Sequence, residues 1–214
     1  MAKSVYVSST YTDLRDHRAA VCDVLDKMRY NSIGMEDYVA RDARVSDECL
    51  RDVEGCDIYL GIFAWRYGYV PQDENPDEWS ITELEYRHAK KLDKSRLLFV
   101  LDAAAPWRDE SKDSSTGEGD NGLRVQRLRE DVNRDRMPGR FTSVHDLALN
   151  AAASLHMYAV DARTRVLSGD LASASCLTMN SSTQPEIIAN VRRAITENAK
   201  TDVIKVNLGK GESW

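Results

Sequence analysis

The sequence lacks the features that place a protein in a membrane or on nucleic acid. No apolar run approaches the roughly 18 residues of a membrane span, and the opening residues MAKSVYVSST lack the apolar core of a signal peptide. The 29 basic and 35 acidic residues are interspersed and give a net charge of -6, whereas a phosphate-binding face usually needs a basic excess. We therefore expect a cytoplasmic protein that contacts neither membrane nor nucleic acid directly.

Patterns that hold metals, disulfides or phosphates are also scarce. None of the four histidines has a partner at metal-ligand spacing, so no metal site is expected. No glycine-rich phosphate loop of either standard type occurs, so side chains and helix ends would have to hold any nucleotide. Four cysteines without CxxC spacing are best explained as buried free thiols in a reducing compartment: Cys22, Cys49, Cys56 and Cys176.

Apolar periodicity predicts one α/β domain over residues 1–158. Short runs typical of buried strands alternate with helical spacing about five times, which argues for a doubly wound parallel sheet with flavodoxin-like strand order. The least interrupted run is DIYLGIF, at residues 57–63, which should be a central strand. The other expected strands are at residues 4–7, 32–36, 96–101 and 140–141, and residues 102–122 are expected to be mostly loop.

The composition changes after residue 158, so residues 159–214 are expected to be a C-terminal extension. Residues 161–180 have no clear period, whereas 185–199 predict a helix and 202–208 a strand. A strand that leads straight into a chain end is a poor stopping place. We therefore expect that the chain is a fragment, and that the extension either begins a further module or packs as an accessory βα unit.

Polar residues gather where the first and third expected strands end. Ser8, Ser9, Thr10 and Asp13 follow the first strand, and the segment AWRYG, residues 64–68, follows the third. In an open parallel sheet the ligand crevice lies at the carboxyl ends of the strands where their order reverses, which for a flavodoxin-like order is between these two strands. The connection after the third strand leads to a helix start at residues 79–89, so three polar clusters should converge there.

The segment WSITELEYRHA, residues 79–89, carries two glutamates at the start of that helix. Ser80 is a good N-cap, and Glu83 three residues later completes a capping box, which by itself explains both residues. Alternatively, the Glu83 carboxylate faces the crevice and stabilises a sugar during bond cleavage. The pattern alone leaves both interpretations open.

Three motifs, VYVSSTYTDLRDHRAAV, GCDIYLGIFAWRYGYVP and WSITELEYRHA, together resemble a TIR-like domain of unknown function. That domain precedes NACHT-type ATPase and tetratricopeptide modules in signalling and defence proteins, and the resemblance covers residues 4–158. More remotely, the motifs are similar to Toll/interleukin-1 receptor (TIR) domains and to nucleoside deoxyribosyltransferases. The TIR pattern W-C-x-x-E-L matches Trp79, Ser80, Glu83 and Leu84, with serine for cysteine. The deoxyribosyltransferase glutamate, four residues before an alanine, matches Glu85 instead.

The resemblance implies a domain that cleaves the N-glycosidic bond of NAD or a related nucleotide when attached modules cluster it. NAD would be the substrate, and no cofactor is implied. Glu83 would serve the oxocarbenium-like sugar, with Glu85 as the alternative carboxylate. The same families also imply the alternative function, a non-catalytic interaction domain that signals by self-association.

The remaining site residues take their roles from the same resemblance. Trp65 or Tyr67 could stack on a base, Arg66 could meet a phosphate, and Ser8, Ser9 and Thr10 could bind ribose or phosphate oxygens. Each has a structural alternative: Arg66 in a salt bridge with Asp57 or Glu85, Trp65 and Trp79 closing the core, and residues 8–10 as a plain turn and cap.

Overall fold

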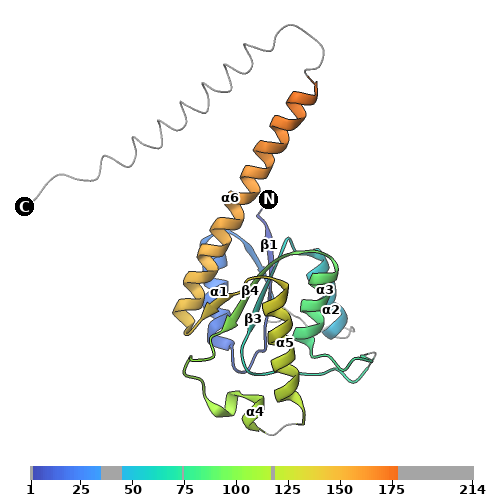
Figure 1. The fold of residues 1–214 in the computed structure, drawn as a ribbon, viewed down its shortest axis with the longest axis vertical. Helices are drawn as coiled ribbons and strands as arrows, with labels where there is room; N and C mark the ends of the chain where they lie inside the picture. Colours follow the sequence, from blue (N-terminus) through green and yellow to red (C-terminus); the bar gives the residue numbers. More distant parts are fainter. Residues whose placement is uncertain (1, 35–44, 74, 117–118, 178–214) are drawn as a thin grey trace, which may run out of the picture. The chain divides into compact units, whose positions relative to one another are not determined.

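The computed structural model describes residues 2–34, 45–73, 75–116 and 119–177, with side chains as far as residue 164. Five strands form one all-parallel sheet in the order β2-β1-β3-β4-β5 (Figure 1). This order confirms the flavodoxin-like fold and puts the reversal of strand order between β1 and β3. The strands are β1 Ser4–Ser8, β2 Asn31–Ile33, β3 Ile58–Phe63, β4 Ser95–Leu101 and β5 Gly139–Phe141.

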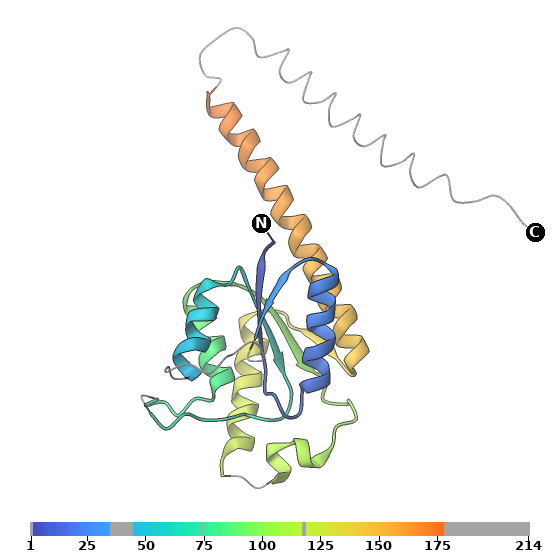
Figure 2. The same ribbon diagram turned by 180° about the vertical axis from the view of Figure 1, so that it is seen from behind.

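Helices cover both faces of the sheet, as Figures 1 and 2 show from opposite sides. The helices α1 and α6 pack on one face, and α2, α3 and α5 pack on the other. Both faces are therefore closed to water, as right-handed crossovers between parallel strands require. The helices are α1 Arg15–Lys27, α2 Val45–Gly55, α3 Ile81–Lys91, α4 Asp113–Thr116, α5 Asn121–Asp135 and α6 Val144–Leu177.

The central strand β3 is buried along its whole length, so alternate side chains feed two separate cores. Ile58, Leu60 and Ile62 join the core beneath α1 and α6, whereas Tyr59 and Phe63 join the core beneath α3 and α5. An uninterrupted apolar run is what a strand covered on both faces needs.

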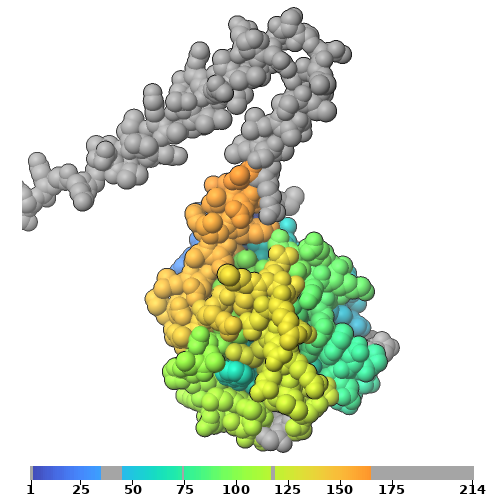
Figure 3. Space-filling model, viewed as in Figure 1, coloured from blue at the N-terminus to red at the C-terminus, as the bar shows by residue number. Residues whose placement is uncertain are grey.

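One buried arginine of α5 holds the carboxyl ends of two strands. The Arg129 guanidinium donates to the carbonyl oxygens of Phe63 at the end of β3, of Ala64 after it and of Leu101 at the end of β4, at 2.7 to 3.2 Å. Its other contact is the Trp65 ring, whose centroid is 3.7 Å from the guanidinium carbon. Burial lowers the pKa of Arg129 to about 10, so the group stays charged at neutral pH. Figure 3 shows α5 in yellow on the outside of this face.

The segment 102–122, expected to be mostly loop, also contains a 3-10 turn at Asp109–Ser111 and the short helix α4. The sequence predicts a helix that Thr142 or Ser143 caps and that ends near Tyr158. This end is wrong: α6 continues to Leu177, because residues 159–177 contain many good helix formers and no proline. The helix expected at 185–199 and the strand at 202–208 lie outside the described residues.

By contacts, the chain divides into two compact units, Met1–Tyr158 and Ala159–Trp214. The sheet, the helices α1 to α5 and α6 as far as Tyr158 belong to the first unit. Within the part of the chain that the structure describes, no helix is long and apolar enough to cross a bilayer.

Replacing Arg129 with methionine should destabilise the domain, because three strand-end carbonyls would lose their buried donor. We expect a loss of about 2 to 4 kcal/mol in the free energy of unfolding, measured in urea. The matched control is Arg127→Met, two residues away on α5 and exposed, which should change stability by no more than about 0.5 kcal/mol. Equal effects of the two substitutions would contradict this role for Arg129.

Candidate functional site

A pocket of about 810 Å³ lies at the carboxyl ends of β1 and β3, where the strand order reverses. This volume is within the range of small-molecule sites. Residues from the loop after β1, the loop after β3 and the starts of α2, α3, α4 and α5 line it: Ser9, Thr10, Tyr11, Thr12, Asp13, Val45, Arg66, Gly68, Tyr69, Val70, Gln72, Ile81, Thr82, Asp113 and Asn121.

Among the described residues, the charged groups that line the pocket are two carboxyl groups and one guanidinium. Thr10 Oγ1 donates to Asp13 Oδ1 at 2.6 Å, whereas Asp13 Oδ2 is buried without a hydrogen-bond partner. Burial raises the pKa of Asp13 above its ordinary value. Arg66 Nε lies 3.5 Å from Oδ1 of the buried Asp113. The expectation that Arg66 pairs with Asp57 or Glu85 is therefore wrong. Asp113 Oδ2 also accepts the Tyr67 backbone N–H at 2.6 Å.

The loop after β3 is fitted closely between β1 and α3. Gly68 has φ +94°, and a Cβ atom there would lie 3.1 Å from Thr10 Cγ2, so this position needs glycine. The next residue, Tyr69, accepts the Ile81 backbone N–H at 2.9 Å, which fixes the loop to the first turn of α3. Two tyrosines also line the pocket: Tyr69, which is 71% exposed, and Tyr11 in the loop after β1, which is 47% exposed.

Glu85 is buried between α3 and β1, and its carboxylate joins these two elements. Its Oε1 accepts from Tyr6 Oη at 2.7 Å, and its Oε2 accepts from Ser8 Oγ at 2.5 Å. Burial raises the pKa of Glu85, while the bonds from Ser8 and Tyr6 act in the opposite direction. Neither Ser8 nor Glu85 lines the pocket, so both are structural neighbours of the site in this conformation.

The Glu83 carboxylate faces away from the pocket. Ser80 Oγ accepts the Glu83 backbone N–H at 3.3 Å, which confirms Ser80 as the N-cap of α3. The carboxylate does not return to the Ser80 backbone as in a capping box. Instead the carboxylate accepts from Tyr67 Oη at 2.6 Å and from Arg87 Nε at 2.7 Å. Burial, together with the hydrogen bond to Glu83, raises the pKa of Tyr67 to about 12.

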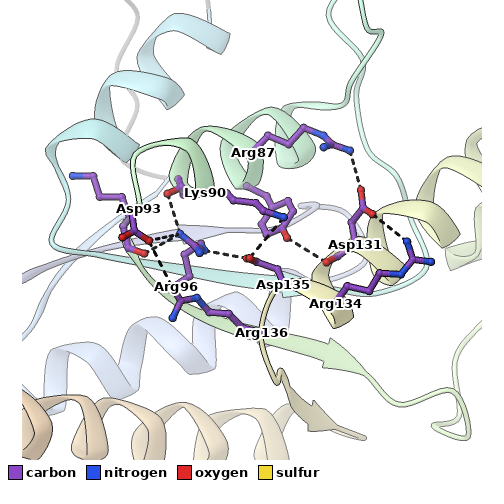
Figure 4. Close-up of polar contacts among 11 residues, drawn as sticks. Arg87, Lys90, Asp93, Arg96, Asp131, Arg134, Asp135 and Arg136 are labelled. Atoms are coloured by element: carbon purple, nitrogen blue, oxygen red, sulfur yellow. Dashed lines mark hydrogen bonds and ion pairs between the residues drawn. The ribbon is translucent and has the colours of Figure 1, made fainter.

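Glu83 therefore lines a second cleft, of about 440 Å³, between α3 and α5. Trp79 also lines it, with the Arg87 guanidinium carbon 4.4 Å from its ring centroid. Arg87 Nη2 donates to Asp131 of α5 at 3.1 Å. Figure 4 shows this pair within a wider set of ion pairs that joins α3, β4 and α5: Asp131 with Arg134, Lys90 and Arg96 with Asp135, and Asp93 with Arg96 and Arg136.

The structure thus brings together only part of the predicted site. The pocket between β1 and β3, called the main pocket from here on, is lined by Ser9, Thr10, Asp13 and Arg66 of the predicted site. The second cleft is lined by Tyr67, Trp79 and Glu83. Trp65 packs against the core under Arg129, so its ring is not presented to either space. Within the described part of the chain, no cluster of His, Cys, Asp or Glu could hold a metal ion.

Of the lining residues that sequence reasoning missed, three bear on the chemistry of the pocket: Asp113, Tyr11 and Tyr69. Asp113 was hidden in a segment expected to be loop, and no local pattern distinguishes a buried aspartate there from its solvated neighbours. Tyr11 and Tyr69 were passed over although they flank the two polar turns. A search for aromatic residues next to those turns would have found both, because turn residues at the carboxyl edge of a sheet line the crevice.

The strand order and this pocket define a flavodoxin-like α/β domain with a cleft at the switch point. A family model described as a domain of unknown function, DUF4062, matches residues 4–156, and the chain belongs to this family. The match confirms the family resemblance of the three motifs, while the links to ATPase modules and to NAD hydrolysis stay predictions. Among curated proteins, none matches the chain.

Among solved structures, the chain is similar to the TIR domains of the activated Roq1 resistosome. That resistosome is described as directly recognising the pathogen effector XopQ. The two share 11% sequence identity with a TM-score of 0.38, over 71% of this chain and 82% of that chain. A likeness this distant carries no argument about activity.

Replacing Glu85 with glutamine should reduce the pH dependence of stability. Because the folded-state pKa of Glu85 is raised, its contribution is lost as pH rises above its ordinary value of 4.5. We therefore expect the difference in unfolding free energy, Glu85→Gln minus wild type, to grow from pH 4.5 to pH 7 in urea titrations. The exposed Glu110→Gln should show no such trend, and a flat difference for Glu85→Gln would contradict the burial argument.

Proposed function

We propose that this chain is a TIR-like effector domain that cleaves the N-glycosidic bond of NAD or a related nucleotide. Cleavage occurs when further modules of a signalling or defence protein cluster the domain. The proposal combines the motif resemblance with one observation: the pocket at the switch point adjoins the start of α3, where two glutamates lie within one turn. That is where a doubly wound fold binds its ligand.

The chemistry requires a carboxylate beside the sugar as positive charge develops on it. Glu83 follows directly on Thr82, which lines the pocket, so the carboxylate is one residue away from the space that the sugar would occupy. To act there, it must leave both Tyr67 and Arg87. Arg87 would not lose all its partners in that event, because Asp131 already accepts from it at 3.1 Å.

Glu85 is the alternative carboxylate. It is closer in sequence to the deoxyribosyltransferase pattern, and it holds Ser8, whose neighbours Ser9 and Thr10 line the pocket. Its complete burial and two hydrogen bonds favour a positioning role, since a sugar could reach it only after β1 and α3 had separated.

A non-catalytic interaction domain is the second candidate function. The observation that favours it is the placement of Glu83 in the second cleft, bonded to Tyr67 and Arg87 and outside the main pocket. In that case the capping of α3 and the ion pairs with α5 would account for the whole motif, and the domain would transmit assembly without chemistry.

The experiment is incubation of NAD with the protein, free and clustered on a multivalent support, with nicotinamide release as the readout. We expect release by the clustered wild type and a loss of roughly 100-fold or more in Glu83→Gln, the typical contribution of such a group. Glu85→Gln should retain release wherever it remains folded. The exposed Glu110→Gln is the matched control and should match wild type.

One result would overturn the proposed cleavage, and another would change the carboxylate assigned to it. If clustered wild type leaves NAD and free nucleosides intact, the enzymatic function should be abandoned in favour of the interaction domain. If Glu83→Gln is as active as wild type while a folded Glu85→Gln is inactive, the reaction stands but the carboxylate is Glu85.

A further inference from the structure

Two exposed tyrosines mark the mouth of the main pocket. Tyr69 is 71% exposed and Tyr11 is 47% exposed, and both line the pocket. The backbone carbonyl of Tyr69 accepts the Ile81 N–H at 2.9 Å, and the Arg15 guanidinium carbon lies 6.0 Å from the centroid of the Tyr11 ring. Two rings held at the entrance of a cavity offer flat apolar surface to a planar ligand.

The aromatic residues expected to stack on a base cannot do so here. Trp65 lies under the Arg129 guanidinium, and the Tyr67 phenol is buried against Glu83. Neither ring lines the main pocket. Among the described lining residues, Tyr11 and Tyr69 are therefore the aromatic groups that a ligand in this pocket would meet.

The charges of the pocket disfavour a phosphate. Its described lining carries two carboxyl groups, Asp13 and Asp113, against the single guanidinium of Arg66, and Asp113 already neutralises that guanidinium at 3.5 Å. The buried Oδ2 of Asp13 lacks a hydrogen-bond partner, and such a group normally has one in a complete site. A sugar hydroxyl is a donor that carries no charge, so it suits this lining better than an anion does.

We propose that the pocket binds a nucleoside, with its base against Tyr69 and Tyr11 and its sugar hydroxyls donating to Asp13 and Asp113. Any phosphate of the substrate stays outside the pocket. This inference rests on the proposed function, and it specifies which part of the nucleotide enters the site and which residues select it.

The test is calorimetric titration of the full chain with two pairs of compounds that differ by one phosphate: adenosine with its 5′-monophosphate, and nicotinamide riboside with its 5′-monophosphate. At least one nucleoside should bind, and its monophosphate should bind no more tightly. Tyr69→Ala and Tyr11→Ala should each weaken nucleoside binding roughly 5- to 100-fold, the usual effect of removing a stacked ring. Tyr69→Phe and Tyr11→Phe keep the ring and should bind like wild type.

A charge variant tests the argument about phosphate. In Asp113→Asn the amide oxygen can still accept the Tyr67 N–H, but Arg66 is no longer neutralised. The monophosphate should then gain roughly fivefold in affinity relative to the nucleoside, as expected for one charge at about 4 Å in water. The exposed Asp109→Asn of the same segment should leave the ratio unchanged.

Three results would overturn the inference: alanine variants of both tyrosines that bind the nucleosides like wild type, monophosphates that bind roughly tenfold or more tightly than nucleosides, or no nucleoside binding at about 1 mM, the weak end of specific binding. The proposed cleavage fails separately. Nucleoside binding that depends on Tyr69 without release of any base would refute cleavage alone, whereas release unaffected by either alanine variant would refute only the present inference.

Discussion

The last carbonyl groups of the parallel strands must find donors where the strands leave the sheet, and the site depends on how this domain meets that requirement. Arg129 reaches from α5 to the carbonyls that follow β3 and end β4, and Arg18 reaches from α1 to Val7 O and Ser9 Oγ at 3.0 Å. Because a buried carbonyl without a donor is costly, these cations let the strands end in polar loops. The pocket is the space between the loops so held.

Tyr67 is hydrogen-bonded to one lining residue of the main pocket and to one lining residue of the second cleft. Its backbone N–H is bonded to Asp113, which lines the main pocket, and its phenol is bonded to Glu83, which lines the second cleft. A ligand that displaced Asp113 would therefore act on the same residue that holds Glu83. Whether the Glu83 carboxylate can reach the main pocket therefore depends on the Tyr67 side chain, whose phenol is bonded to it.

Much of the fold could be predicted from the sequence because its signals are local. The apolar run 57–63 predicted a strand covered on both faces, and Ser80 within WSITELEYRHA predicted a helix start that the Ser80–Glu83 bond confirms. The direction of individual side chains could not be predicted, because it depends on partners far away in the chain. Arg66 pairs with Asp113, 47 residues later, and the Glu83 carboxylate accepts from Tyr67, 16 residues earlier. The stacking residues were misassigned for the same reason, since only the α5 arginine reveals that Trp65 is covered.

The central claim is that the ligand site is the pocket between β1 and β3 and not the cleft between α3 and α5. Amide and indole NMR signals of the isotopically labelled chain, followed during titration with NAD, test it most directly. The account predicts that the backbone signals of Thr10, Gly68 and Thr82 shift together while the Trp79 indole signal stays in place. Shifts confined to the Trp79 indole and Arg87, with the pocket signals unchanged, would contradict it.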